Sequence, residues 1–178
     1  LPEQPVSRQA MAAFLYRSQQ ATPGYSPDYL DVPIPHSFED EIGWLQSTGL
    51  AQGYEDGTFR PTAPITRQAL AVFLWRLAGA PVVAGPTFHD VPADHPFAPA
   101  ITWMAATSLT TGYDDGTFRP GGTLSRQAMV AFLHRLELRG GTAADVAPAG
   151  ALPEGVEVGV GAGDGGQEPA GPGEAPAA

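Results

Sequence analysis

Residues 53–61 read Gly-Tyr-Glu-Asp-Gly-Thr-Phe-Arg-Pro, and residues 112–120 repeat the phrase as Gly-Tyr-Asp-Asp-Gly-Thr-Phe-Arg-Pro. The two copies are offset by 59 residues, and the same offset separates Arg8 from Arg67 and Arg67 from Arg126. A fixed internal period predicts an array of supersecondary units, none of which can bury its apolar face alone. We therefore expect an assembled surface rather than a single catalytic pocket.

Three helices are predicted at the same period. Each begins with a hydroxyl residue that can cap the free amides of the first turn, followed by Arg, Gln and Ala. Apolar residues then recur at the i, i+3, i+4 and i+7 spacing of one helix face. The capping residues are Ser7, Thr66 and Ser125, and Gly79 and Gly140 are expected to end two of these helices.

A second, shorter helix is predicted before each complete copy of the first. Residues 38–45 and 97–104 place Phe, Ile and then Leu or Met four and three positions apart, with a Trp beside the apolar stripe. Gly49 is expected to end the first of these helices, and Ser108 stands in its place in the second. Helices of about three turns are marginal in isolation, so their stability must come from packing.

The loops between the paired helices are expected to be tight and ordered. Each contains an Asp-Gly turn bracketed by two aromatic residues. We expect Phe59 and Phe118 to pack against the helices, and we favour a core position for Tyr54 and Tyr113 as well. Strand content is expected to be very small.

Composition and charge change along the chain. The 178 residues have a net charge of −10, and residues 140–178 carry six carboxylates and no basic residue. That segment is rich in Gly, Ala and Pro and is predicted to be disordered. The acidic balance gives no electrostatic footprint for nucleic acid, and no apolar run reaches the roughly 20 residues that span a bilayer.

No catalytic or metal-binding constellation is recognised. The chain has no cysteine, its four histidines lack a ligand-type spacing, and no nucleophile-elbow or phosphate-loop pattern occurs. Counting from Glu55, the twelfth position is Thr66, where a calcium loop needs Glu, so Asp56 and Asp115 are predicted to form turns. We therefore expect no enzyme, no cofactor and no metal site.

These phrases resemble the S-layer homology (SLH) repeat. Its pattern has a Phe-x-Asp-Val start, a first helix, a Gly-Tyr-x-Asp-Gly-Thr-Phe-x-Pro loop and a second helix that begins Thr-Arg-Ala-Glu. The matching positions here are residues 30–33 and 89–92, the two loops and the three helix starts. The Arg of the helix start is kept, whereas its Glu is replaced by Ala10, Ala69 and Ala128.

The resemblance implies a mainly α fold in which helix–loop–helix repeats form a pseudo-threefold arrangement with grooves between them. It divides the chain into the C-terminal half of a first repeat at 1–29, a second repeat at 30–88, a third at 89–140 and a disordered acidic tail at 141–178. Because the first unit is only half present, we expect the sequence to be a fragment or a processed product.

The function that the resemblance implies is noncovalent anchoring of a surface protein to the bacterial cell wall, through a polysaccharide linked to peptidoglycan. Such a module acts outside the cell and does not insert into a membrane. Two alternatives stay open. One is a protein–protein assembly module of a surface layer, with self-association, and the other is an accessory module of an exported hydrolase whose catalytic domain is not in this chain.

The expected ligand-binding residues lie at the helix starts and beside the loops. Each Arg sits in a first turn, where the helix dipole disfavours a cation. It is therefore expected either to clamp an anionic or hydroxylated glycan between repeats or to form a salt bridge to Asp31 or Asp56. The aspartates before Val-Pro could alternatively cap a turn or a helix, and the tryptophans could be core. The full expected set is Arg8, Arg67, Arg126, Gln68, Gln127, Asp31, Asp90, Trp44 and Trp103.

Overall fold

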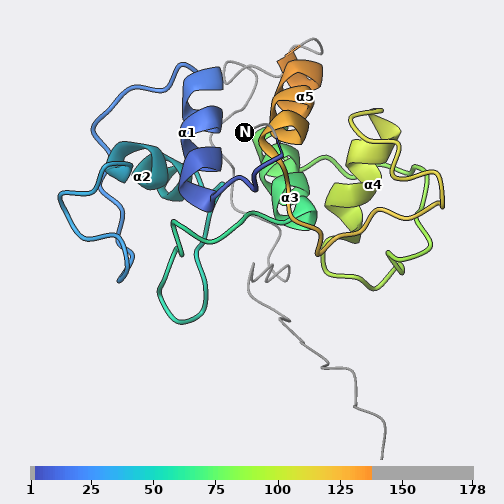
Figure 1. The fold of residues 1–178 in the computed structure, drawn as a ribbon, viewed down its shortest axis with the longest axis horizontal. Coiled ribbons are helices and arrows are strands. Elements are labelled where there is room, and N and C mark those ends of the chain that lie inside the picture. The colour runs from blue at the N-terminus through green and yellow to red at the C-terminus, as the bar shows by residue number, and fades with distance from the viewer. Residues whose placement is uncertain (1–2, 138–178) are drawn as a thin grey trace, which may run out of the picture.

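The computed structural model describes residues 3–137 and contains five α-helices there. In chain order they are α1 (Arg8–Ser18), α2 (Glu39–Ser47), α3 (Arg67–Leu77), α4 (Ala98–Ala106) and α5 (Arg126–Glu137), as Figure 1 shows. Within these residues no strand forms, and β pairing is confined to three isolated bridges. The predicted mainly α architecture is confirmed. The predicted tail at 141–178 and the expected stop at Gly140 lie outside the described residues.

The longer helices begin where the hydroxyl residues predict. The side-chain oxygens of Ser7, Thr66 and Ser125 accept hydrogen bonds from the amide three residues later, at 3.3, 3.3 and 3.2 Å. Each cap satisfies one of the first-turn amides that have no partner inside the helix. The predicted end of α3 is also confirmed, since Gly79 follows the C-cap residue Ala78 with a φ of +82°.

The shorter helices α2 and α4 begin after Phe38 and Phe97, without a side-chain cap. Both end in a left-handed residue, Gly49 with a φ of +71° and Ser108 with a φ of +53°. Glycine adopts this conformation without a steric penalty, whereas serine does not. α4 thus ends at the position equivalent to the end of α2, although the serine that follows it adopts the left-handed conformation less readily than glycine.

The segments that lead into α1, α3 and α5 form a closed ring of backbone hydrogen bonds. The amide of Val6 donates to the carbonyl of Leu124 at 2.8 Å, Leu124 donates to Ile65 at 3.0 Å, and Ile65 donates back to Val6 at 2.8 Å. All three side chains are buried. Because the three residues occupy equivalent positions in the repeat, the ring marks a pseudo-threefold axis.

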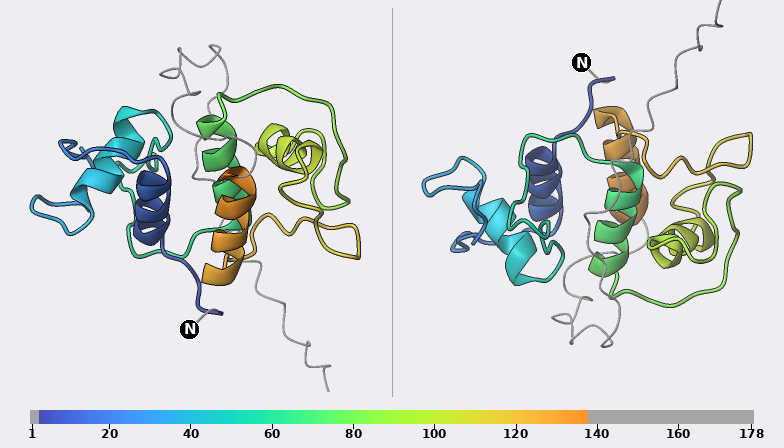
Figure 2. Two further views of the ribbon diagram at one scale, coloured as in Figure 1. Left: turned by 90° about the horizontal axis from the view of Figure 1, so that it is seen from above. Right: turned by 90° about the horizontal axis from the view of Figure 1, so that it is seen from below.

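The helices pack in pairs that cross the sequence repeats. α1 packs against α2 and α3 packs against α4, while α5 makes a smaller contact with α1. The two pairs lie on opposite sides of the molecule in Figures 1 and 2. We call α1, α2 and residues 53–61 the first lobe, and α3, α4 and residues 112–120 the second lobe.

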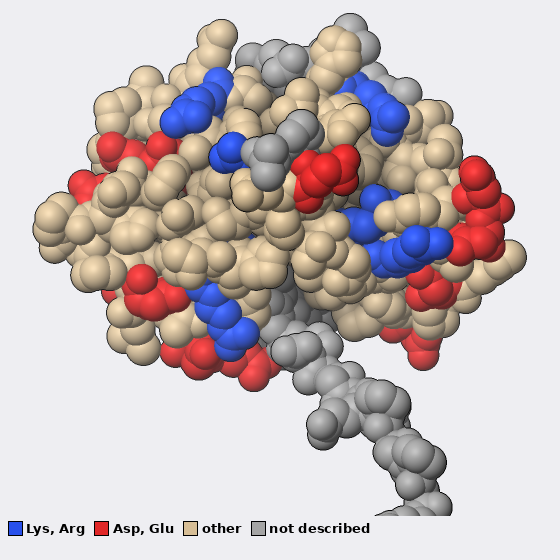
Figure 3. Space-filling model, viewed as in Figure 1, with Lys and Arg blue, Asp and Glu red and all other residues tan. Residues whose placement is uncertain are grey.

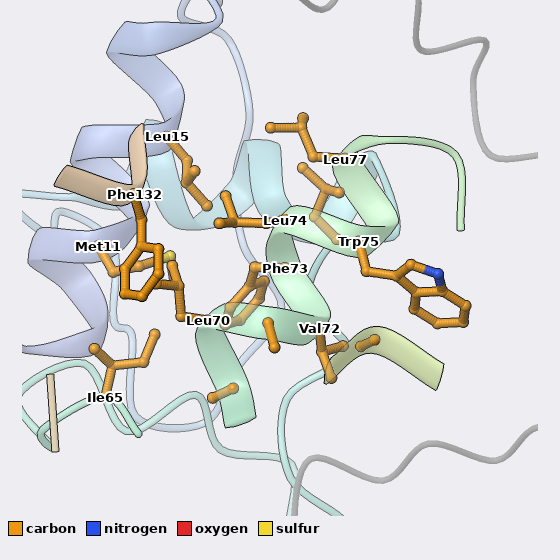
Figure 4. Packing of buried hydrophobic residues seen from close by; sticks show 14 of the residues in the cluster. Met11, Leu15, Ile65, Leu70, Val72, Phe73, Leu74, Trp75, Leu77 and Phe132 are labelled. Carbon is orange, nitrogen blue, oxygen red and sulfur yellow. The ribbon is translucent and has the colours of Figure 1, made fainter. Parts of the chain in front are cut away.

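One continuous core joins the two lobes and α5. Every residue of α3 from Ala69 to Leu77 is buried. Figure 4 shows Leu70 and Leu74 of α3 directed toward the side chains of α1, with Phe132 of α5 close by. The lobes are therefore parts of one body rather than separate domains, and their junctions are fixed by this core.

Candidate binding seams

The Asp-Gly loop is held by its own aspartate. In Asp56, Oδ1 accepts hydrogen bonds from the amide of Thr58 at 3.0 Å and from its hydroxyl, and Oδ2 pairs with the arginine four residues later at 3.1 Å. The second loop repeats this arrangement around Asp115. There, the Thr117 hydroxyl and the Arg119 guanidinium lower the pKa of Asp115 to about 2. The predicted turn-forming role of both aspartates is confirmed.

Asp31 and Asp90 fasten each loop to the start of its repeat. The Asp31 carboxylate accepts the amides of residues 59 and 60, both at 2.7 Å, and Asp90 accepts the two equivalent amides at 2.8 and 2.7 Å. Burial raises the pKa of Asp90, but these backbone hydrogen bonds outweigh it, so the pKa is lowered. Each aspartate thus holds a loop 28 residues away, not the neighbouring turn or helix that the sequence suggested.

Arg8 and Arg67 insert into the loop of the following repeat. Nε of Arg8 donates to the carbonyl of Phe59 at 2.6 Å, and Nε of Arg67 donates to that of Phe118 at 2.7 Å. Each guanidinium carbon also lies 4.6 Å from the centroid of the same Phe ring. Arg8 is 2 % exposed, and burial lowers its pKa, whereas Arg67 is half-buried. The two arginines therefore close the seams between consecutive repeats.

The loop tyrosines lie between pairs of arginines. The ring of Tyr54 is 4.9 Å from the guanidinium carbon of Arg8 and 3.9 Å from that of Arg60, and Tyr113 has the equivalent neighbours at 4.9 and 3.8 Å. Tyr113 is 40 % exposed and Tyr54 is half-buried, so the core position that we favoured for them is wrong. Attraction between cations and the ring faces keeps these rings at the seam instead.

The expected salt bridge from a helix-start arginine to Asp31 or Asp56 does not form. In residues 3–137, the two salt bridges lie inside the loops and join Arg60 to Asp56 and Arg119 to Asp115. The carboxylates are thus already engaged with loop groups. The helix-start arginines meet carbonyl oxygens and ring faces, which relieve the unfavourable placement of a cation in a first turn.

The third helix start presents its polar residues to solvent. Arg126 and Gln127 are exposed, and the side chain of Arg126 has no hydrogen bond, ion pair or ring contact with the described residues. The sequence has three such helix starts and two Gly-Tyr-x-Asp-Gly-Thr-Phe loops. Gln68 is half-buried, and its backbone amide donates to the carbonyl of Pro120 at 2.9 Å. The three helix-start arginines thus have different environments: Arg126 is open to solvent, whereas Arg8 and Arg67 are held in seams.

Trp44 and Trp103 belong to the core. They are 6 % and 5 % exposed, and Trp44 meets Tyr16 edge-on with ring centroids 5.8 Å apart. Only a small part of either residue therefore reaches the surface. A sugar ring that stacked there would need more exposed ring face than this arrangement gives.

Arg76 is a buried cation that the sequence analysis missed. It is 5 % exposed, and Nη1 donates to the carbonyl of Leu50 at 3.0 Å, which joins α3 to the first lobe. Nε and Nη2 are buried without a hydrogen-bond partner among the described residues, and burial lowers the pKa. The available signal was the repeat itself, since Arg17 and Arg135 stand 59 residues to either side. Arg135 donates to the equivalent carbonyl of Leu109 at 2.9 Å.

Charges of both signs are interspersed over one face of the molecule. Figure 3 shows acidic side chains at the outer parts of both lobes, with arginines between them. In the described part of the chain, no group of three or more His, Asp or Glu residues could hold a metal ion. None of the helices there combines the length and the apolar character of a membrane span.

A family model matches each of the two complete repeats. Residues 28–71 and residues 87–130 match the S-layer homology domain. Each match covers a lobe-forming helix and loop together with the start of the next long helix.

Three relatives give the range of similarity. The chain is 31 % identical over 137 residues to Cell surface glycoprotein 1 of Acetivibrio thermocellus, which covers 70 % of this chain and 6 % of the relative. It is 39 % identical over 80 residues to the Cellulosome-anchoring protein of the same organism, covering 42 % of this chain and 18 % of the relative. It is 30 % identical over 105 residues to an S-layer protein of Bacillus licheniformis, covering 58 % and 12 %. The chain therefore spans less than a fifth of the length of each.

Proposed function

We propose that this chain, which belongs to the S-layer homology domain family, anchors a surface protein to the bacterial cell wall by binding a wall polymer without a covalent bond. The family match and the cell-surface and S-layer relatives agree with an extracellular localisation at the cell surface. The relative named as a cellulosome-anchoring protein supports the anchoring role.

The observation that carries the proposal is the open guanidinium of Arg126 beside Gln127, at a position where the other repeats have a closed seam. Guanidinium groups bind carboxylate and phosphate oxygens through paired hydrogen bonds. An amide side chain next to a guanidinium adds a donor and an acceptor for sugar hydroxyls. We therefore propose an acidic wall polysaccharide as the ligand, with Arg126 and Gln127 as its principal contacts.

The remaining expected residues have graded access to such a ligand. Arg67 and Gln68 are half-buried at the second seam and can meet a polymer from one side. Arg8 is sealed, and we assign it to seam closure. Four residues lie at the margin of the proposed contact set, because the two carboxylates already accept loop amides and the two indoles are largely buried: Asp31, Asp90, Trp44 and Trp103.

Co-sedimentation with purified wall sacculi tests the proposal. We expect Arg126→Ala to weaken binding about ten- to a hundredfold, because hydrogen bonds to charged groups contribute about 1.5–3 kcal/mol and each 1.4 kcal/mol is about tenfold. Combining it with Arg67→Ala should weaken binding further, since several weak contacts act together. Arg17→Ala is the matched control, because Arg17 is also an exposed arginine on a long helix, α1. Binding that is unchanged in the Arg67/Arg126 double variant would disprove the arginine contacts.

Light scattering separates anchoring from lattice assembly. A chain that stays monomeric and still sediments with sacculi supports anchoring. A chain that forms concentration-dependent oligomers and does not sediment with sacculi supports the assembly module.

We also propose that the module itself is noncatalytic. The support is the sequence, in which no nucleophile, base and oxyanion pattern occurs. Prolonged incubation with sacculi should release no soluble sugar or peptide, and such release would contradict the proposal.

A further inference from the structure

The loops at 53–61 and 112–120 each contain an Asp-Gly pair. An aspartate followed by glycine isomerises readily, because glycine has no side chain to hinder its amide. The amide nitrogen attacks the carbon of the aspartate side-chain carboxyl, so that a C–N bond forms, a C–O bond breaks and water leaves. Water then opens the resulting five-membered imide. Opening at the main-chain carbonyl leaves isoaspartate, in which the main chain runs through the former side chain.

The first loop withholds both reactants of this step. The oxygen leaves as water only from a neutral carboxyl, whereas Asp56 is held as a carboxylate. Its Oδ1 accepts the amide of Thr58 at 3.0 Å and the Thr58 hydroxyl, and its Oδ2 pairs with the Arg60 guanidinium at 3.1 Å. These two side chains also lower the pKa of Asp56. The attacking nitrogen, that of Gly57, already donates to the carbonyl of Tyr54 at 2.9 Å.

The second loop repeats the arrangement. Oδ1 of Asp115 accepts the amide of Thr117 at 3.0 Å, Oδ2 pairs with Arg119 at 2.9 Å, and the amide of Gly116 donates to the carbonyl of Tyr113 at 2.9 Å. The hydrogen bonds from Thr117 and Arg119 lower the pKa of Asp115 from 3.8 to about 2. Because one pKa unit changes the fraction of neutral acid by about tenfold at neutral pH, this carboxyl is almost never in the reactive form.

Isoaspartate in these loops would disturb the seams. The turn is closed by the amide of Tyr54, which donates to the carbonyl of Thr58 at 2.8 Å. The next residue, Phe59, is fixed at its amide by Asp31 and at its carbonyl by Arg8. Isomerisation inserts an extra carbon into the main chain inside this turn, so the Phe59 carbonyl would shift away from the arginine that closes the seam.

We propose that the threonine two residues after each loop aspartate and the arginine four residues after it protect the Asp-Gly pair from isomerisation in the folded protein. The chain also contains its own unprotected reference. A third pair, Asp164-Gly165, has Gly166 and Glu168 at the positions of the threonine and the arginine, and it lies outside the described residues. Isoaspartate should therefore form first at Asp164.

Incubation of the whole chain at neutral pH tests this inference without any wall polymer, so its outcome is distinct from that of the anchoring proposal. Peptide mapping with electron-transfer fragmentation distinguishes the two linkages at each site. We expect isoaspartate to form at Asp164 at least about tenfold faster than at Asp56 or Asp115, because one pKa unit changes the neutral fraction of an acid by about tenfold. In guanidinium chloride the three rates should converge. Loop sites that age as fast as Asp164 in the native chain would overturn the inference.

Substitutions in one loop make the result specific, because the other loop of the same molecule is the matched control. Thr58→Val combined with Arg60→Gln should raise the rate at Asp56 toward that at Asp164 and leave Asp115 slow. Thr58→Ser alone keeps the hydroxyl and should keep the protection. The inference is overturned if Asp56 stays slow in the double variant, or if the Ser variant ages as fast as the double variant. A rise of equal size at Asp115 would also overturn it, since protection would then come from the fold as a whole.

Discussion

The two lobes have equivalent Asp-Gly loops, but they differ in the linkers that run along their short helices. In the first lobe, Asp40 accepts the amides of Gly24 and Tyr25 at 2.8 and 3.3 Å, and Gln46 accepts that of Asp28 at 2.8 Å. The equivalent positions of α4 are Pro99 and Ala105, which have no side-chain acceptor. A mainly apolar cavity of about 270 Å³ lies there instead, lined by residues of the linker and of α4 such as Val82 and Thr102. The loop–helix seam is thus the common structural unit, and the linker is the part in which the repeats diverged.

Removing the loop phenylalanine should have the largest effect and should be the same in both lobes. Phe59 and Phe118 are 0 % and 1 % exposed, and truncation of a buried Phe to Ala typically costs about 3–5 kcal/mol. Urea unfolding of Phe59→Ala and Phe118→Ala measures this cost, with the corresponding Leu variants as milder controls. Costs that differ between the lobes by more than 2 kcal/mol would break the equivalence of the two loops.

Replacing a helix-start arginine with alanine should lower the free energy of unfolding. The loss should be largest at Arg8, smaller at Arg67 and smallest at Arg126. Alanine at position 8 leaves the carbonyl of Phe59 without its charged donor in a buried seam, at a cost of about 2–3 kcal/mol. The cost should be smaller for Arg67, which is half-buried, and within about 0.5 kcal/mol of zero for Arg126.

Thermal and urea unfolding of the three variants give this order directly. A cost for Arg126→Ala as large as that for Arg8→Ala would mean that the third start has a partner in solution.

The parts that could be predicted from the sequence are those in which local chemistry dictates structure. Hydroxyl caps, Asp-Gly turns and a helical apolar period each act over a few residues, so they identify α1 to α5 and the tight loops correctly. The roles of Asp31 and Arg8 could not be predicted in this way. Their partners lie 28 and 51 residues away, and only the packing of one repeat on the next brings them together. Arg76 was missed for the same reason, since its burial comes from the neighbouring lobe.

Removing the hydrogen bonds that hold the linker of the first lobe should make this linker as weakly held as that of the second lobe. Asp40→Ala removes the acceptor of two amides in a partly exposed site, and we expect a loss of about 1 kcal/mol. Hydrogen exchange at Gly24 and Tyr25 should quicken while exchange in the loop 53–61 stays unchanged. Pro99→Ala is the matched control, because that position makes no such bond in the second lobe. Unchanged exchange at both amides would show that the linker is held by packing alone.

A further difference between the lobes should appear at alkaline pH, and only in the first lobe. Tyr29 is 7 % exposed, and its hydroxyl donates to the carbonyl of Ala51 at 3.2 Å. Burial raises its pKa from 10.0 to about 12. A pKa that is higher in the folded state favours the protonated form, so its contribution to stability is complete below pH 10 and is lost as the pH rises through 12. The equivalent residue of the second lobe is Phe88, which has no titratable group.

Tyr29→Phe should therefore flatten the melting temperature between about pH 10 and 12 relative to the unaltered chain. Phe88→Tyr should steepen it, because the carbonyl of Thr110 stands where Ala51 stands in the first lobe. Comparing the variants at each pH cancels the titration of the remaining tyrosines, which all three chains share. Parallel curves of melting temperature against pH for all three chains would mean that the phenol at position 29 has the same pKa in the folded and unfolded states. The difference between the lobes would then lie in the linkers alone.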